Sequence, residues 1–121
     1  MADKLLTMYW LPHCTTCQKA VQYLEKIGCK VAEFRDLKSN PLDRKEVEDL
    51  ARLAGGAGEL FSRRAVKYRE LKLSERELAP AEMIQLMSEE YTFIKRPVIV
   101  WRRSAIAGFS AKSIDEFLKI S

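Results

Sequence analysis

The sequence predicts an α/β fold in which a four-stranded mixed sheet is flanked by helices. The chain begins with a strand–helix–strand pattern, ends with a strand–strand–helix pattern, and has a stretch of helical character between the two. Alternation of strand and helix implies parallel pairing, whereas two strands joined by a tight turn imply an antiparallel hairpin. The length of 121 residues suits one domain, 1–121, with a helical insertion at about 41–92.

The first half of the predicted sheet comes from residues 5–35. Leu5 to Trp10 is a short apolar run typical of a buried strand, and the loop after it leads into a helix that Gly28 ends. Lys30 to Arg35 then forms a second, shorter strand. Apolar residues at steps of three and four mark the buried face of the helix, namely Cys17, Ala20, Val21, Leu24 and Ile27.

The middle of the chain is expected to be helical. One helix lies between residues 41 and 55, where Asp43 and Glu46 make a capping-box pattern. Glu59 to Leu71 is ambiguous but helical in part, and Pro80 suits the first turn of a further helix. The apolar stripes are Val47, Leu50, Ala51 and Ala54 in the first of these helices, and Met83, Ile84, Met87 and Tyr91 in the last.

The final third predicts a hairpin and a helix. Val98 to Trp101 is a buried-strand candidate, and Ser104 to Ala107 pairs with it through a turn at 102–103. Gly108 ends that strand, and Ser110 caps the last helix. The complete order of elements is that of a thioredoxin-type fold with a helical insertion in its middle. The core side chains of the last helix are Ile114, Phe117 and Leu118.

Composition and charge exclude several classes of protein. Hydrophobic residues make up 47% and charged residues of both signs 31%, which fits a folded globule and not a disordered chain. No apolar run approaches the roughly 18 residues that a membrane span needs, and no export signal precedes the first strand, so we expect a cytoplasmic protein. The net charge of +4 permits an anionic ligand. Without a dense basic stripe it does not indicate direct nucleic-acid binding.

Cys14 and Cys17 stand where the first strand passes into the first helix. Residues three apart on a helical turn share one side, close enough for their sulfurs to bond. Cys14 would meet unpaired backbone N–H groups and the positive end of the helix, both of which favour a thiolate. Cys17, one turn further in, would be more buried and would resolve a bond formed at Cys14. We therefore predict a redox-active pair, with two structural cysteines or half a zinc site as the alternatives.

The other candidate residues carry weaker signals. His13 is the only histidine and directly precedes Cys14, so a protonated ring could help to hold a thiolate; a solvent-facing loop residue is the alternative. No metal site is expected because a second close Cys/His pair is absent, and Cys29 is interpreted as a partly buried small residue. Arg63 and Arg96 could hold an oxyanion or a sulfenate, but the residues alone do not place them near the cysteines.

The chain resembles the arsenate reductase (ArsC)/Spx family of thioredoxin-fold proteins along essentially its whole length. One matching piece is the early cysteine that opens a helix, within residues 9–20. Another is an arginine–proline pair leading into an apolar strand, within residues 94–100. The remaining matches are Phe61-Ser62-Arg63, the segment 68–71, and Gly108-Phe109 before the last helix.

This resemblance implies roles for individual residues. Cys14 matches the catalytic or redox cysteine of the family, and Arg63 resembles the conserved arginine after the insertion helices. Arg96 resembles the arginine that precedes a cis-proline, which is Pro97 here. The family's arsenate reductases carry a third arginine after the glycine that follows the last strand, where this chain has Phe109. Those enzymes also usually lack the second cysteine and take electrons from glutathione and glutaredoxin.

Three functions follow from these observations. The first is a thiol–disulfide oxidoreductase or redox switch in which Cys14 attacks, Cys17 resolves, and Arg63 and Arg96 line the site beside Pro97. It needs no cofactor, only a thiol donor such as glutathione, glutaredoxin or thioredoxin. The second is an arsenate reductase with an oxyanion substrate, against which the missing third arginine argues. The third is an Spx-like regulator that binds the C-terminal domain of the RNA polymerase α-subunit. Nothing in the sequence separates the first from the third.

Overall fold

The computed structural model describes residues 5–120, which form two compact units. The first unit contains the chain up to Asn40 and from Arg96 onward, and the second is Pro41–Lys95. The second unit thus occupies the stretch that the sequence assigns to a helical insertion. Within residues 5–120, no helix has the length and apolar character that a membrane crossing requires.

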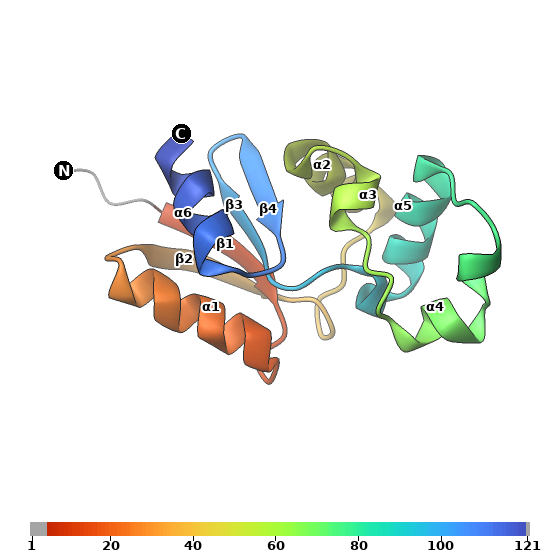
Figure 1. The fold of residues 1–121 in the computed structure, drawn as a ribbon, viewed down its shortest axis with the longest axis horizontal. Helices are drawn as coiled ribbons and strands as arrows, with labels where there is room; N and C mark the ends of the chain where they lie inside the picture. The colour runs from red at the N-terminus through yellow and green to blue at the C-terminus, as the bar shows by residue number, and fades with distance from the viewer. Residues whose placement is uncertain (1–4, 121) are drawn as a thin grey trace. The chain divides into compact units, whose positions relative to one another are not determined.

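The first unit is built on a four-stranded sheet with the strand order β2-β1-β3-β4 (Figure 1). β1 (Leu5–Trp10) pairs in parallel with β2 (Lys30–Asp36) and antiparallel with β3 (Val98–Trp101). β4 (Ser104–Ala107) pairs antiparallel with β3 as a hairpin. This mixed sheet with flanking helices confirms the thioredoxin-like plan predicted from the sequence. The strands match their predicted ranges, except that β2 runs one residue further.

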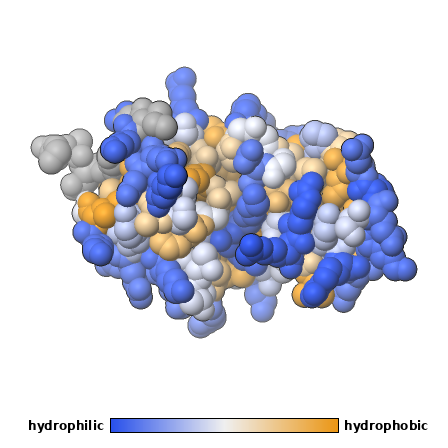
Figure 2. Space-filling view, in the orientation of Figure 1, coloured by the Kyte–Doolittle hydropathy of each residue, from blue (hydrophilic) through white to orange (hydrophobic). Residues whose placement is uncertain are grey.

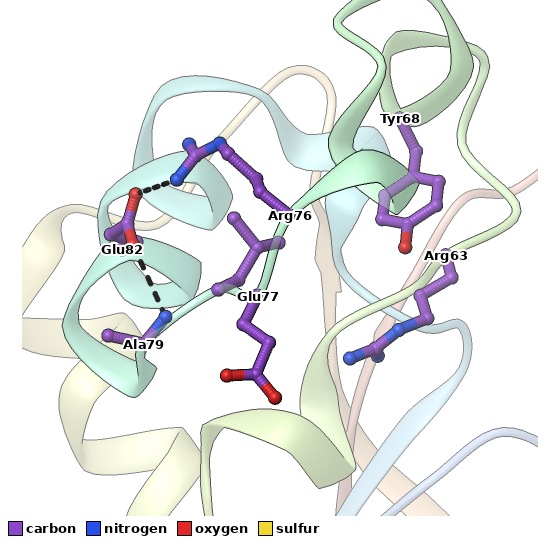
Figure 3. A pocket seen from close by; sticks show the side chains of 7 residues that line it. Arg63, Tyr68, Arg76, Glu77, Ala79 and Glu82 are labelled. Atoms are coloured by element: carbon purple, nitrogen blue, oxygen red, sulfur yellow. Dashed lines mark hydrogen bonds and ion pairs between the residues drawn. The ribbon is translucent and has the colours of Figure 1, made fainter.

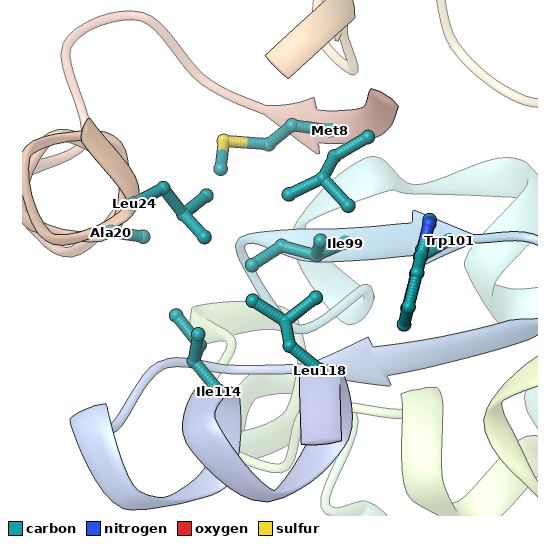
Figure 4. Packing of buried hydrophobic residues seen from close by; sticks show 8 residues of the cluster. Met8, Ala20, Leu24, Ile99, Trp101, Ile114 and Leu118 are labelled. Carbon is teal, nitrogen blue, oxygen red and sulfur yellow. The ribbon is translucent and has the colours of Figure 1, made fainter. Parts of the chain in front are cut away.

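Two helices pack against one face of this sheet, α1 (Thr15–Lys26) and α6 (Ala111–Ile120) (Figure 1). Apolar residues at helical spacing in both helices meet the inward side chains of β1 and β3, as Figure 4 shows. Each large aliphatic side chain buried in this way contributes roughly 1.5–3 kcal/mol to folding. The cluster consists of Leu6, Met8, Ala20, Leu24, Ile99, Trp101, Ile114 and Leu118.

The ends of these helices follow the predicted signals, with one correction. The backbone N–H of Ser113 donates to Oγ of Ser110 at 3.0 Å, so Ser110 caps α6 as predicted. Gly28 follows the end of α1 with a left-handed φ of 81°. The prediction that Ile27 lies on the buried face of α1 was wrong, since its side chain is 40% exposed. The helix has ended at this residue, which is its C-cap, so helical periodicity no longer sets the direction of the side chain.

The second unit is helical. The predicted capping box of α2 is present, since the N–H of Glu46 donates to Asp43 Oδ1 at 2.8 Å and the N–H of Asp43 donates to Glu46 Oε1 at 3.1 Å. The ambiguous stretch 59–71 is helical in part, as predicted. Tyr91, which the pattern assigns to the last helix of this unit, lies beyond its end. The helices are α2 (Arg44–Ala54), α3 (Ala57–Leu60), α4 (Val66–Glu70) and α5 (Pro80–Glu89), with single 3₁₀ turns at Leu73–Glu75 and Tyr91–Phe93.

The surface agrees with the mixed charge of the sequence. Hydrophilic residues predominate on the face shown in Figure 2, with smaller apolar areas between them. Isolated exposed apolar side chains are normal in soluble folds and need no partner. The exposed large hydrophobic residues of the described chain are Leu5, Ile27, Phe34, Val66 and Leu71.

Candidate functional site

The connection between β1 and α1 holds Cys14 in a defined position. Cys14 is the N-cap residue of α1, with an extended backbone at φ −81° and ψ 119°. Its N–H donates to the carbonyl of Leu11 at 3.0 Å, and its own carbonyl accepts the first helical hydrogen bond from Gln18, also at 3.0 Å. Nε2 of Gln18 donates back to the carbonyl of Pro12 at 2.9 Å. These bonds tie the loop to the first turn of the helix.

The N-terminal end of α1 lacks an ordinary cap. It has no side-chain capping hydrogen bond and no acidic residue in its first turn. The backbone N–H groups of Thr16 and Cys17 at this helix start lower the pKa of the Cys14 thiol. The first N–H groups of a helix have no partner within the helix and carry its positive partial charge, so they stabilise an anion. The start of α1 therefore favours the thiolate form of Cys14, the residue at its N-cap position.

Opposing effects act on the pKa of Cys14. Burial raises this pKa because it removes water from the thiolate. Hydrogen bonds from the N–H and the thiol of Cys17 and from the N–H of Thr16 lower it, and so does the positive charge of Arg96. The lowering effects together exceed the effect of burial, so the pKa of Cys14 lies below the ordinary value for a thiol. A larger share of Cys14 is therefore thiolate at neutral pH.

Cys17 has the opposite character. Its side chain is fully buried on the inner side of α1, and this burial raises its pKa to about 12. A backbone hydrogen bond from Leu11 and the charge of Arg96 lower this pKa, whereas the hydrogen bond to Cys14 and the charge of Cys14 raise it. Cys17 thus keeps its proton at neutral pH. Both cysteines are free thiols in the structure.

Arg96 and Pro97 lie in the first unit, directly before β3. The peptide bond between them is cis, which confirms what the family resemblance implied. Pro97 is buried, and its carbonyl accepts a hydrogen bond from the N–H of Gly108 at 2.8 Å. Arg96 is partly buried, and its positive charge lowers the pKa of both cysteines. The structure therefore brings three predicted site residues together: Cys14, Cys17 and Arg96.

Arg63 belongs to the second unit, in the loop between α3 and α4. Its side chain is exposed, and its guanidinium lies over the ring of Phe61 at 5.8 Å from the ring centroid. The placement of Arg63 beside Cys14 stays a prediction from the family resemblance.

Three further residues named in the sequence have different surroundings. His13 is exposed in the loop before α1, which matches the solvent-facing alternative. Cys29 is partly buried and packs against the core cluster on the sheet, as predicted. Phe109 packs against the same cluster, with its ring centroid 6.0 Å from that of Tyr23. Within the described residues, no group of three or more His, Cys, Asp and Glu could hold a metal ion.

Sequence reasoning did not single out Leu11 or Gln18, although both hold the cysteine loop. A glutamine on the exposed side of a helix is usually solvated, and its role here depends on the chain turning back at Pro12. The one available signal was its position four residues after Cys14, which is the partner position for the first helical hydrogen bond.

Comparison with known proteins identifies the family. The sequence model described as the ArsC family matches residues 9–117, which is most of the chain. The protein belongs to the ArsC family. The match includes Cys14, Cys17, Arg63, Arg96 and Phe109, so every position that the sequence resemblance singled out lies inside it.

The relatives that this chain resembles include proteins with different named functions. The uncharacterized protein YusI of Bacillus subtilis is 31% identical over 114 residues, covering 92% of this chain and 96% of the relative. The global transcriptional regulator Spx of the same organism is 27% identical over 115 residues, covering 94% and 87%. The structure of an arsenate reductase from Vibrio cholerae has a TM-score of 0.81 at 20% identity, covering 95% and 98%. At that identity, the likeness to the Vibrio structure shows the shared fold alone.

Proposed function

We propose that this ArsC-family protein is a thiol–disulfide redox protein in which Cys14 attacks and Cys17 resolves. The observation that carries the proposal is that the pKa values of two neighbouring thiols are shifted in opposite directions. The pKa of Cys14 is lowered at the helix start, and burial raises the pKa of Cys17 to about 12. Attack requires a thiolate at neutral pH, whereas a resolving thiol has to stay protonated until the mixed disulfide exists.

The proposed reaction transfers two electrons to a substrate disulfide. Of the two substrate sulfurs, the thiolate of Cys14 attacks the second, the substrate disulfide breaks, and the first substrate sulfur leaves as a thiolate that takes a proton from water. A mixed disulfide then joins Cys14 to the second substrate sulfur. Because Cys14 is no longer charged, two of the causes that raise the pKa of Cys17 disappear.

The second half of the reaction uses Cys17. Its sulfur attacks the sulfur of Cys14, the mixed disulfide breaks, and the second substrate sulfur leaves with the proton that Cys17 gives up. The products are a reduced substrate and a Cys14–Cys17 disulfide. A thiol donor, either a small thiol or a redox protein, reduces this disulfide again and returns both electrons.

Different observations support the proposed roles of Arg96 and Arg63. Arg96 is proposed to stabilise the thiolate of Cys14, because its charge lowers the pKa of that thiol. Arg63 enters the proposal through the family resemblance, as a second cation for an anionic substrate group. A guanidinium stays charged at any physiological pH and offers planar donors, which suits both roles.

A second candidate is a redox-dependent regulator that binds the RNA polymerase α-subunit. The observation in its favour is the 27% identity to Spx along 94% of this chain. The same Cys14–Cys17 disulfide would then serve as a switch and not as a catalytic intermediate. The two candidates share their chemistry and differ in the partner that responds to it.

Arsenate reduction has less support. Phe109 occupies the position at which the family's arsenate reductases carry an arginine, and here it packs against the core. Loss of one electrostatic donor typically costs roughly 10²–10³ in rate, so we expect weak or no arsenate turnover. Phe109→Arg is expected to raise it. Turnover by the unmodified protein at about 1–10³ per second with glutathione and glutaredoxin would contradict this expectation.

Disulfide mapping tests the pairing. Trypsin should release both cysteines in one peptide, Leu5–Lys19, and Cys29 in another, Ile27–Lys30. Mild oxidation should therefore remove two hydrogens from the first peptide and leave Cys29 free. A cross-link between the two peptides, or no bond at all, would contradict the proposal.

Alkylation tests the two roles, and single variants are needed because the thiols titrate jointly. In Cys17→Ser, iodoacetamide should modify Cys14 with an apparent pKa below that of a free thiol. In Cys14→Ser, Cys17 should react slowly at neutral pH. If Cys17 is the faster and more acidic thiol, the roles are reversed.

Partner assays separate the candidate functions. Purified protein is compared in its reduced and oxidised forms for disulfide reduction and for capture of the polymerase α-subunit. Catalytic disulfide reduction without α-subunit capture supports the enzyme. Capture that depends on the redox state, without turnover, supports the regulator.

A further inference from the structure

A pocket of about 610 Å³ lies entirely within the second unit. This volume falls in the range typical of small-molecule sites. Its walls come from the loop after α3, from α4, and from the segment that leads into α5. The lining residues are Arg63, Tyr68, Arg76, Glu77, Leu78, Ala79 and Glu82.

One wall of the pocket is anchored to the core of this unit. Phe61, two residues before Arg63, stacks on Phe93 with ring centroids 5.3 Å apart and meets the ring of Tyr68 edge-on at 6.2 Å. The N–H of Ser62 donates to the carbonyl of Phe93 at 2.6 Å. The backbone just before Arg63 is therefore hydrogen-bonded beside the buried Phe61, and the half-buried ring of Tyr68 packs against Phe61.

The opposite wall contains an ion pair that already satisfies two of the charged groups. Nη1 of Arg76 lies 2.7 Å from Oε2 of Glu82, and Oε1 of Glu82 accepts a hydrogen bond from the N–H of Ala79 at 3.3 Å. These two contacts use both carboxylate oxygens of Glu82 at the start of α5. A ligand in the pocket would therefore gain little from Arg76 or Glu82.

Three other polar groups in the pocket have no hydrogen bond or ion pair with any residue in the described part of the chain. They are the guanidinium of Arg63, the hydroxyl of Tyr68 and the carboxylate of Glu77. In Figure 3 the guanidinium and the carboxylate extend toward the same space from opposite sides, and the hydroxyl of Tyr68 is directed toward Arg63. A cation and an anion that face one cavity without pairing suit a ligand that carries both opposite charges.

We propose that this pocket binds a small zwitterion, an amino acid or short peptide, through Arg63 and Glu77. The guanidinium of Arg63 bonds the ligand carboxylate, for which its planar pair of N–H donors has the right geometry. The carboxylate of Glu77 bonds the ligand ammonium, and Tyr68 adds a hydroxyl donor to the ligand carboxylate. A simple anion meets the charge of Glu77 and a simple cation meets that of Arg63, so each is disfavoured.

This inference shares Arg63 with the redox proposal but does not depend on it, because the pocket contains no cysteine and the ligand needs no thiol. The probes are the alanine peptides Ala, Ala-Ala and Ala-Ala-Ala, which vary the separation of the two charges. N-acetyl-Ala-Ala keeps only the carboxylate, and Ala-Ala-amide keeps only the ammonium. Binding is followed by calorimetry and by the backbone amide NMR signals of residues 63–82 at millimolar concentrations.

We expect at least one of the uncapped compounds to bind, and each cap to weaken binding of the dipeptide about tenfold. A tenfold loss of affinity corresponds roughly to the free energy that one hydrogen bond between charged groups contributes to binding. Arg63→Gln should weaken binding of the dipeptide. In this variant Ala-Ala and Ala-Ala-amide should bind equally, because the partner of the ligand carboxylate has been removed. In Glu77→Gln, Ala-Ala and N-acetyl-Ala-Ala should bind equally, because the partner of the ligand ammonium has been removed. The matched variants Arg64→Gln and Glu75→Gln, which change exposed neighbours outside the pocket lining, should bind like the unmodified protein.

Circular dichroism of each variant checks that it is folded before it is compared. Equal binding of capped and uncapped dipeptides would overturn the zwitterion, and so would binding that neither Arg63→Gln nor Glu77→Gln changes. Tighter binding of N-acetyl-Ala-Ala than of Ala-Ala would show an anion site instead. The absence of any signal change with all the probes would also overturn the proposal.

Discussion

The N-terminal ends of α1 and α2 solve the same physical problem with different groups. Both helices begin with N–H groups that lack helical partners and carry positive partial charge. In α2 the side chains of Asp43 and Glu46 accept these hydrogen bonds reciprocally. In α1 no side chain does so, and the N–H groups of Thr16 and Cys17 instead lower the pKa of the Cys14 thiol. One helix start is thus satisfied by side chains that stabilise the fold, whereas the other lowers the pKa of a thiol.

The difference has an energetic cost for α1. A good N-cap typically contributes about 1 kcal/mol, and a cysteine is not among the preferred capping residues. Burial on the inner side of the helix offsets this loss, since Cys17, Ala20 and Leu24 are all buried there. Natural proteins break a local stability rule mainly at functional or strained sites. Because α3, α4 and α5 also lack a side-chain capping hydrogen bond, it is the lowered pKa of Cys14, and not the missing cap, that points to chemistry at α1.

The largest expected effect comes from a change at the start of α1 that removes thiol reactivity but keeps a residue able to cap the helix. Cys14→Ser should lower thiol–disulfide exchange roughly 10³-fold or more, because the nucleophile is lost. Serine is a preferred N-cap, so the free energy of unfolding should stay the same or rise by up to about 1 kcal/mol. Exchange is measured with a model disulfide, and unfolding with urea. Cys29→Ser is the control and should keep full exchange activity. If Cys14→Ser also kept its exchange activity, the start of α1 would not hold the reactive thiol and the contrast with α2 would be wrong.

The second prediction concerns the pH dependence of stability. The pKa of Cys17 is about 12 in the folded protein against an ordinary 9.0, so the folded state holds this proton more tightly than the unfolded state. The stabilisation is therefore fully present below pH 9 and is lost as the pH rises from 9 toward 12. Urea unfolding of the reduced protein should show this loss. Cys17→Ala should lose less stability over the same range, and an equal loss in both proteins would contradict the assignment.

Much of this arrangement could be predicted from the sequence because local signals were strong. The apolar runs at 5–10 and 98–101 and the helical steps after Cys17 defined the sheet and α1. Asp43 and Glu46 predicted the start of α2, and the spacing of Cys14 and Cys17 predicted that the two thiols lie close together. In each case one segment of chain contained the whole signal, so no long-range contact was needed to interpret it.

The remaining features depend on contacts between distant segments. The charge of Arg96 reaches Cys14 only because β3 pairs beside β1, which brings residues far apart in sequence together. The exposure of Ile27 depends on where α1 ends, which periodicity does not fix. No sequence signal pointed to a ligand role for Glu77 or Tyr68, because an exposed glutamate in a loop is usually solvated and a tyrosine on a helix is usually packed. Their shared pocket depends on the packing of the whole second unit.

The third prediction tests the ordinary cap. Asp43→Ala should lower the free energy of unfolding by about 1 kcal/mol, because the N–H of Glu46 loses its acceptor at the start of α2. The alkylation rate of Cys14 should not change, since this helix start carries no reactive group. Asp49→Ala, which removes an exposed ion pair within the same helix, is the control and should cost less. A slower alkylation of Cys14 in Asp43→Ala would show that the two helix starts are coupled.

The smallest expected effect shows whether the hydrogen bonds at the helix start or the charge of Arg96 lower the pKa of Cys14 more. The hydrogen bonds of Cys17 and Thr16 lower the pKa of Cys14 more than the charge of Arg96 does. In the Cys17→Ser background, Arg96→Gln should therefore raise the apparent pKa of Cys14 but leave it below that of a free thiol. Alkylation at neutral pH should slow by a few-fold. Added salt should produce part of the same change in the parent protein, because salt screens a charge more than a hydrogen bond.

Arg103→Gln is the matched control, since it removes an exposed arginine from the turn between β3 and β4 of the same unit. It should leave the alkylation profile of Cys14 unchanged. An unchanged profile in Arg96→Gln would mean that its charge does not act on Cys14. A return of the pKa of Cys14 to that of a free thiol would mean that the arginine alone maintains the thiolate. The N–H groups at the start of α1 would then contribute nothing to reactivity, and the contrast with α2 would fail at its physical basis.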